Sequence, residues 1–76
     1  MIIDEELRAK VEPYLPKDYQ KKGADQTGFS RSMIYKVLHE GQDNVTVSDW
    51  LIHTALKNKR VKERAEKKLS LIAKQL

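Results

Sequence analysis

The chain has 76 residues, of which 34% are charged, and a formal net charge of +4. A chain this short buries only about 60% of the surface that it exposes when unfolded, so we expect one domain spanning residues 1–76. Cysteine is absent and histidine occurs only as His39 and His53, which excludes disulfides and a closed Cys/His zinc site. The N-terminus lacks the pattern of a secretory signal and no apolar run reaches membrane-spanning length. We therefore expect a complete cytoplasmic protein without an appended effector domain.

The charge is unevenly distributed along the chain. Residues 1–29 hold five basic and six acidic side chains, whereas residues 30–76 hold ten and five. This excess of positive charge in the C-terminal part favours a polyanionic partner, although a solvated basic surface is the simpler interpretation.

A first helix is predicted to begin after Asp4, which can cap it, and to carry Leu7 and Val11 on one face. Pro13 and Pro16 should end it. A second, short helix is expected to open at residues 17–18, with Asp18 as the better cap, and to run through Gln26.

Thr27 and Gly28 indicate a turn, after which Ser30 should cap a third helix ending at His39 or Glu40. Gly41 stops this helix. Its apolar residues follow helical spacing, and these are Met33, Ile34, Val37 and Leu38.

A fourth helix is expected to be capped by Thr46 or Ser48 and to carry the apolar residues Trp50, Leu51, Ile52, Ala55 and Leu56. A fifth helix is predicted over residues 60–76. Its apolar residues, spaced four, four, three and four apart, are Val61, Ala65, Leu69, Ile72 and Leu76. Whether Asn58 separates the two helices stays open. No segment alternates as a strand, so the predicted fold is an all-α bundle of about five helices.

The segment around the second and third helices meets the requirements of a helix-turn-helix. Such a motif needs a small residue where the helices cross, a turn residue that tolerates positive φ, and apolar residues that hold the second helix. Ala24 supplies the small residue, Gly28 the turn and Phe29 an apolar plug beside it. Ile34 and Val37 supply the inward face.

These residues resemble a known family. Ala24-x3-Gly28-Phe29-x4-Ile34-x2-Val37-Leu38 is similar to the helix-turn-helix of lambda-repressor/Cro-type regulators. Residues 34–38, Gly41 and residues 44–45 are also similar to lactose-repressor-type headpieces, and the resemblance covers about residues 18–57. Gly23 departs from the family's usual aliphatic residue and Thr27 from its apolar one. The resemblance implies a lambda-repressor-like fold that binds DNA through a helix-turn-helix over about residues 18–40.

On the third helix, the candidates for contact with DNA are Ser30, Arg31, Ser32, Tyr35, Lys36 and His39. Because the N-terminal residues of a recognition helix meet base edges, Arg31 is expected to contact a guanine and Ser32 a base edge or phosphate. Tyr35 can touch a thymine methyl, or instead pack on Phe29 or Trp50. Lys36 fits a phosphate contact or plain solvation, and Arg31 can equally be an ordinary first-turn residue. His39 is expected to interact with the helix dipole.

Further phosphate contacts are predicted in two flanking segments. Those of the loop after the third helix are Gln42, Asn44 and Thr46, as the resemblance to headpiece loops implies. Ordinary turn chemistry is the alternative for them. Those at the start of the second helix are Lys17, Gln20, Lys21 and Lys22. Phe29 and Trp50 are expected in the core.

The sequence therefore predicts sequence-specific binding of double-stranded DNA by a small transcriptional regulator, which we expect to be a homodimer through its C-terminal helices. The basic run over residues 57–68 can add long-range attraction to DNA, although such a run is usually a solvated face. The alternative is a helical protein-interaction module without specific DNA binding. An enzyme is not expected, because the sequence offers no cysteine nucleophile, metal cluster, phosphate loop or catalytic triad, and no cofactor or small-molecule ligand is implied.

Overall fold

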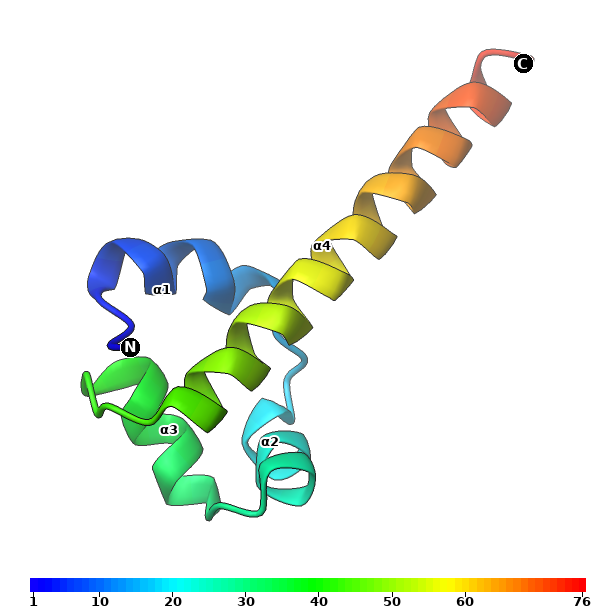
Figure 1. Cartoon of the computed structure of the whole chain (residues 1–76). Helices are drawn as coiled ribbons and strands as arrows, with labels where there is room; N and C mark the ends of the chain where they lie inside the picture. Colours follow the sequence, from blue (N-terminus) through cyan, green and yellow to red (C-terminus); the bar gives the residue numbers. More distant parts are fainter.

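A computed structural model describes residues 1–76 and contains helices without any strand, which confirms the all-α prediction. The elements in chain order are α1 (Glu5–Val11), the 3-10 helix η1 (Glu12–Tyr14), α2 (Tyr19–Thr27), α3 (Arg31–His39) and α4 (Val45–Ala73). In Figure 1, α1 lies on one side of the first half of α4, with α2 and α3 on the other.

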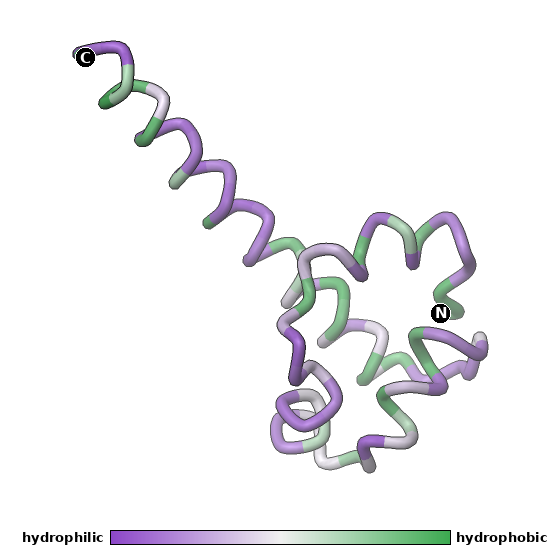
Figure 2. The backbone as a smooth tube through the Cα atoms, turned by 180° about the vertical axis from the view of Figure 1, so that it is seen from behind, coloured by the Kyte–Doolittle hydropathy of each residue, from purple (hydrophilic) through white to green (hydrophobic).

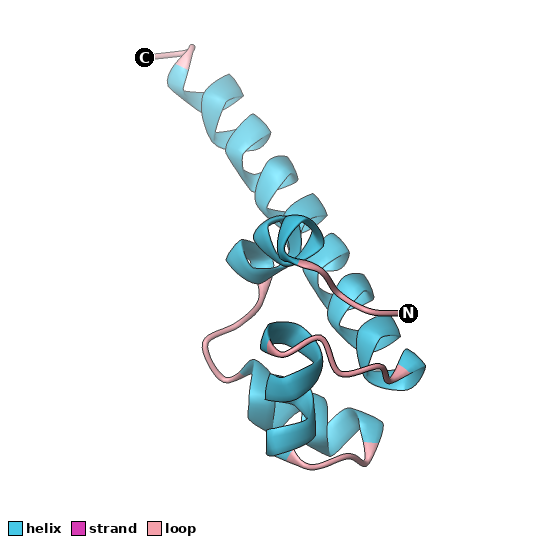
Figure 3. Ribbon diagram, turned by 90° about the vertical axis from the view of Figure 1, so that its left-hand side faces the viewer, coloured by secondary structure: helices cyan, strands magenta, loops and turns pink.

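The expectation of about five helices is wrong, because the predicted fourth and fifth helices form the single 29-residue helix α4 (Figure 3). Asn58 does not interrupt it. The amide Nδ2 of Asn58 donates to the backbone carbonyl of Tyr14 at 2.8 Å, so its side chain bonds to η1 while its backbone stays helical. No glycine or proline lies within α4 to bend or end it.

The starts of α1 and α4 are capped by short polar side chains. Asp4 Oδ1 accepts a hydrogen bond from the backbone N–H of Leu7 at 2.8 Å, as predicted. The cap of α4 is Asn44, whose Oδ1 accepts from the N–H of Val47 at 3.1 Å, and not Thr46 or Ser48. Ser48 is instead buried in the first turns of α4, where its hydroxyl donates to the carbonyl of Met1 at 3.0 Å.

The core lies between α1, α3 and the first half of α4. Its buried apolar residues are Ile3, Val11, Ile34, Val37, Leu38, Val47, Leu51 and Ala55. The N-terminal segment is held against it, because the α-amino group of Met1 pairs with Asp43 at 2.8 Å. The core thus anchors α3 along one side of α4.

Beyond the core, α4 projects away from the other helices (Figure 1). We call residues 57–76 the arm. Every arm residue except the half-buried Asn58 is exposed, and the helix ends at Ala73 rather than at the predicted Leu76. Figure 2 shows the arm as mostly hydrophilic backbone with apolar residues at intervals. No helix combines the length and apolar character that crossing a membrane requires.

Candidate nucleic-acid interface

The connection between α2 and α3 is a tight turn centred on Gly28. Gly28 has φ of +80°, a conformation that favours glycine, and its N–H donates to the carbonyl of Ala24 at 3.0 Å. The hydroxyl of Thr27 donates to the carbonyl of Gly23 at 2.6 Å and accepts from the N–H of Phe29 at 3.3 Å. The polar residue at position 27, which departs from the family pattern, therefore has a structural role in this turn.

Gly23, the other departure, lies where α2 approaches α3 and α4 closely. Gly23 is buried, and a Cβ at this position would stand 3.0 Å from Cζ3 of Trp50 and 3.2 Å from Cδ1 of Ile34. Trp50 and Ile34 fill the space that a larger side chain on α2 would need. Ala24, which the motif assigns as the small crossing residue, is half-buried against the core.

Of the two aromatic residues expected in the core, only one packs there. Trp50 is half-buried against the core, and its indole N–H donates to Oε1 of Gln26 on α2 at 2.7 Å. Phe29 is 40% exposed, so its assignment as a plug of the core is wrong. The turn at Gly28 directs the chain outward at position 29, and Trp50 already occupies the space between α2 and α4.

α3 is held by one face and open on the other. The hydroxyl of Ser30 accepts from the N–H of Met33 at 3.1 Å, as its cap, and Ile34 and Val37 are fully buried, as predicted. The outer face consists of exposed residues, namely Arg31, Ser32, Tyr35 and Lys36. None of these four side chains takes part in an ion pair or hydrogen bond with another residue. They form the largest group of predicted site residues that the structure brings together.

His39 differs from this outer face, because its ring is fixed by neighbouring residues. Its Nε2 lies 3.0 Å from the hydroxyl of Tyr19 on α2, and its ring centroid lies 4.6 Å from that of Tyr35. Its backbone carbonyl accepts from Nη1 of Arg8 on α1 at 3.3 Å. Tyr35 thus stacks on His39, and not on Phe29 or Trp50 as the alternative interpretation had it. Burial raises the pKa of the Tyr19 hydroxyl.

The predicted contact residues of the loop between α3 and α4 differ in whether their side chains are free to bind phosphate. Gln42 and Thr46 are exposed, but the side-chain oxygen of Asn44 is used in capping α4. The exposed carboxylate of Glu40 lies at the start of this loop, and that of Asp43 lies within it, paired with the α-amino group of Met1. Because carboxylates repel phosphate, the loop is a poorer phosphate-binding segment than the sequence pattern suggests.

At the start of α2, Lys17 and Lys21 are exposed, whereas Gln20 is half-buried. Asp18 occupies the N-cap position of α2, as predicted, but its side chain makes no capping hydrogen bond and pairs with Lys22 at 3.6 Å. Lys17 and Lys21 are the residues of this segment that remain available to an anion.

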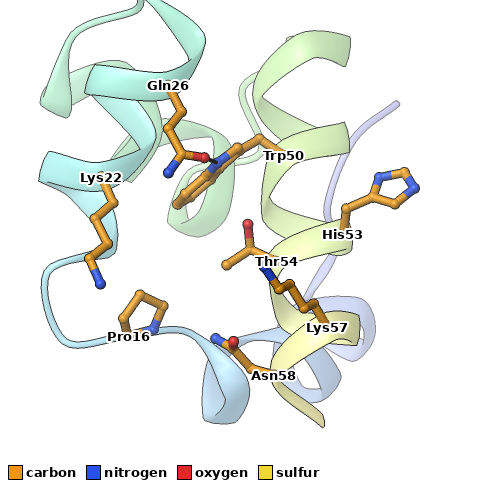
Figure 4. Close-up of a pocket in the computed structure, with 8 residues that line it drawn as sticks. All are labelled: Pro16, Lys22, Gln26, Trp50, His53, Thr54, Lys57 and Asn58. Atoms are coloured by element: carbon orange, nitrogen blue, oxygen red, sulfur yellow. Dashed lines mark hydrogen bonds between the residues drawn. The ribbon is translucent and has the colours of Figure 1, made fainter. Parts of the chain in front are cut away.

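A hollow between α2 and α4 adjoins this segment (Figure 4). Its lining is polar except for Trp50 and consists of Pro16, Lys22, Gln26, Trp50, His53, Thr54, Lys57 and Asn58. Lys22 and Lys57 come to it from opposite sides, one from α2 and one from the first turn of the arm. No group of three His, Cys, Asp or Glu residues in the chain is placed to hold a metal ion.

The charges of the arm and of the rest of the chain differ more than those of residues 1–29 and residues 30–76 do. The arm holds eight basic and two acidic side chains, a net charge of +6, whereas residues 1–56 hold the other seven basic and nine acidic ones, a net charge of −2. The helical domain that carries α2 and α3 is therefore slightly acidic, and the arm carries the whole positive excess. A comparison of residues 1–29 with residues 30–76 hides this separation of charge, because the charge changes sign near residue 57, where α4 leaves the core.

No protein-family model matches the sequence, and comparison with curated proteins and with solved structures finds no similar one. The functional assignment therefore rests on the residues and their arrangement.

Proposed function

We propose that the protein binds double-stranded DNA sequence-specifically through α3, with α2 as the supporting helix, and acts as a small cytoplasmic regulator of transcription. The observation that carries this proposal is the outer face of α3. Four exposed polar or aromatic side chains stand there without an ion pair or side-chain hydrogen bond, on a helix whose opposite face is fully buried. A helix fixed in this way can present donors to the base edges of a major groove.

Each residue of this face fits a distinct contact. Arg31, in the first turn, has the planar donor group that pairs with a guanine, and Ser32 beside it can meet a base edge or phosphate. Tyr35, held by its stacking on His39, presents a ring and a hydroxyl at a defined angle. Lys36, on the following residue, supplies the one further cation of the face.

Selection of binding sites from randomised duplexes with the whole chain tests the proposal. We expect enrichment of a defined sequence, and Arg31→Ala should lower affinity by about 1 to 3 kcal/mol at one base position only. A symmetric repeat in the selected sites would indicate a dimer. Absence of any enriched sequence, or an unchanged base preference in Arg31→Ala, would contradict this role of α3.

A second candidate function, interaction with another helix, is favoured by the apolar stripe of the arm, which we define as Val61, Ala65, Leu69 and Ile72. Leu69 is 64% and Ile72 50% exposed, on the face of α4 that continues the core-facing positions Val47 and Leu51. We propose a second copy of the chain as the occupant. In a parallel pair, Glu66 beside the stripe of each copy would face the basic flank of the other.

The oligomeric state tests this second function. Sedimentation equilibrium should show a dimer for the native chain and a monomer for Ile72→Gln. Leu71→Gln is the matched control, because Leu71 is equally exposed, at 55%, but lies off the stripe. A monomeric native chain, or equal loss of the dimer in both variants, would reject self-association through the stripe.

A further inference from the structure

The arm carries a second charged surface that α3 does not explain. Six of its cations follow one another at helical spacing along a single face, next to the apolar stripe but separate from it. We call them the basic ridge, and they are Lys57, Arg60, Arg64, Lys67, Lys68 and Lys74. Their neighbours along the face lie mostly three or four residues apart, which at about 100° per residue keeps them within one third of the helix circumference.

None of the ridge cations forms an ion pair within the chain, and Glu63 is the one acidic residue that lies beside them in the helix. The only ion pair of the arm joins Lys62 to Glu66 at 3.9 Å on the other flank of the stripe. Lys59 and Lys62 also lie off the ridge, each about 6 Å from the centroid of the Tyr14 ring. Both cations outside the ridge thus have partners in the chain, whereas the ridge has none.

A row of like charges has an energetic consequence. Unpaired cations at spacings of three and four residues repel one another and destabilise a helix. The contacts of the arm with the domain involve Asn58, Lys59 and Lys62, which lie off the ridge, so they do not offset this repulsion. A linear polyanion placed along the ridge would remove the repulsion and release its own counterions.

We propose that the basic ridge binds the phosphate backbone of a nucleic acid, as a contact independent of sequence and separate from α3. From Lys57 to Lys74 the ridge is about 25 Å long, a length over which duplex DNA presents several phosphates. It begins at the hollow between α2 and α4, where Lys57 and Lys22 line the same space (Figure 4). A backbone on the ridge therefore also comes near Lys22 of α2, which is paired with Asp18 in the free chain.

Two other anionic partners fit the ridge less well. A helix lying on an anionic membrane places free cations on both flanks of its apolar face. Here the second flank holds only Lys59 and Lys62, which both lie over the Tyr14 ring, and Lys62 is also paired with Glu66. An acidic protein helix would need extensive apolar contacts as well as charge, whereas the exposed apolar residues among the six ridge cations are only Leu56, Leu71 and, at the edge, Val61 of the stripe. A face on which cations predominate matches a phosphate backbone.

The salt dependence of binding to a random-sequence duplex tests the proposal. If all six cations contact phosphates, affinity should fall about 1000-fold between 50 and 200 mM salt, with a log–log slope of about −5. The double variant Arg64→Gln with Lys67→Gln should reduce the steepness of this slope by about two units. The control, Lys59→Gln with Lys62→Gln, removes the same charge from the same half-helix and should change the slope by less than one unit.

The glutamine variants keep a good helix former at each position, and circular dichroism verifies that the arm remains helical. Equal slopes for the ridge and control variants would overturn the proposal, because the effect would then be diffuse attraction. Binding of polyglutamate or of anionic phospholipid vesicles as tightly as the duplex, at the same salt concentration, would also overturn it. The base preference of Arg31→Ala tests the role of α3 alone, and the salt slope of the ridge variant tests the ridge alone. The two experiments therefore show which of the two proposals fails.

Discussion

Replacement of Gly23 by alanine tests how closely α2 is pressed against α3 and α4. On an isolated helix the change would stabilise by about 1 kcal/mol, because glycine is the poorer helix former. In this chain the added Cβ would stand 3.0 Å from the Trp50 ring and 3.2 Å from the Ile34 side chain. Ile34 is fully buried and Trp50 is held by its bond to Gln26, so neither side chain can move freely. Overpacking of this kind costs about 1 to 3 kcal/mol.

The two effects together predict a net loss of about 1 kcal/mol in the free energy of unfolding, measured by urea denaturation followed by circular dichroism. For a chain of this length that loss lowers the Tm by about 4 to 8 °C. Asp25→Ala, at an exposed position of the same helix, serves as the control, because it changes helix propensity without adding a contact. A Gly23→Ala variant that gains the full stabilisation expected from propensity would refute the close approach.

A double-mutant cycle identifies the atom responsible. Ile34→Val removes the Cδ1 that the new methyl group meets and should cost about 0.5 to 1.5 kcal/mol by itself. Combined with Gly23→Ala, it should cost less than the sum of the two single changes, by at least about 0.5 kcal/mol. Strict additivity would mean that Cδ1 does not restrict the site, and that Trp50 or Cγ1 of residue 34, which valine keeps, does.

Three further results are expected. Asn44→Ala should lower the free energy of unfolding by about 1 kcal/mol through loss of the α4 cap, whereas Thr46→Ala should change it by less than about 0.5 kcal/mol, as followed by denaturation. Because burial raises the pKa of Tyr19 in the folded chain, its contribution to the free energy of unfolding is fully present below the ordinary pKa of 10.0 and is lost as pH rises through the higher folded pKa. Thermal melts at alkaline pH should show a weaker decline for Tyr19→Phe, which also loses the hydrogen bond to His39. Lys36→Ala should weaken binding to all duplexes alike and reduce the steepness of the salt slope by about one unit in titrations.

The local parts of the fold followed from the sequence, because their causes lie within a few residues. Asp4 and Ser30 each precede a run of apolar residues at helical spacing, and each caps its helix as predicted. Ile34 and Val37 are buried because the periodicity of α3 allows only one inward face. The turn at Gly28 was predictable for the same reason, since positive φ there favours glycine.

The parts that failed depend on partners far away in the sequence. Asn58 reads as a possible helix break, but its amide bonds to the carbonyl of Tyr14, 44 residues earlier, and α4 continues. Gly23 departs from the family pattern, and nothing local in the sequence shows that Trp50 occupies the space beside it. Phe29, which the motif alone would place inside, is 40% exposed.

The candidate site was predictable to the same degree. The outer residues of α3 follow from helical periodicity, but the fixing of His39 by Tyr19 and Arg8 joins three separate helices and has no sequence signal. The basic ridge has a signal in the three- and four-residue spacing of its cations. In the sequence, that signal lies within a basic run that is typical of a solvated face. The structure shows that the ridge cations form no ion pairs and that α4 extends away from the core there.

The distribution of charge bears on how α3 and the arm would share a duplex-binding function. The domain that holds α3 has a net charge of −2, so Arg31 and Lys36 would have to attract phosphate without a positive excess in the rest of the domain. Binding of that kind gives base preference with little affinity, because most non-specific affinity for DNA comes from cations that displace counterions. The arm, at +6, supplies such cations on a face separate from the apolar stripe. A second copy on the stripe would bring one glutamate, Glu66, toward the six cations of the ridge and leave most of them open, so self-association and backbone binding are compatible on one helix.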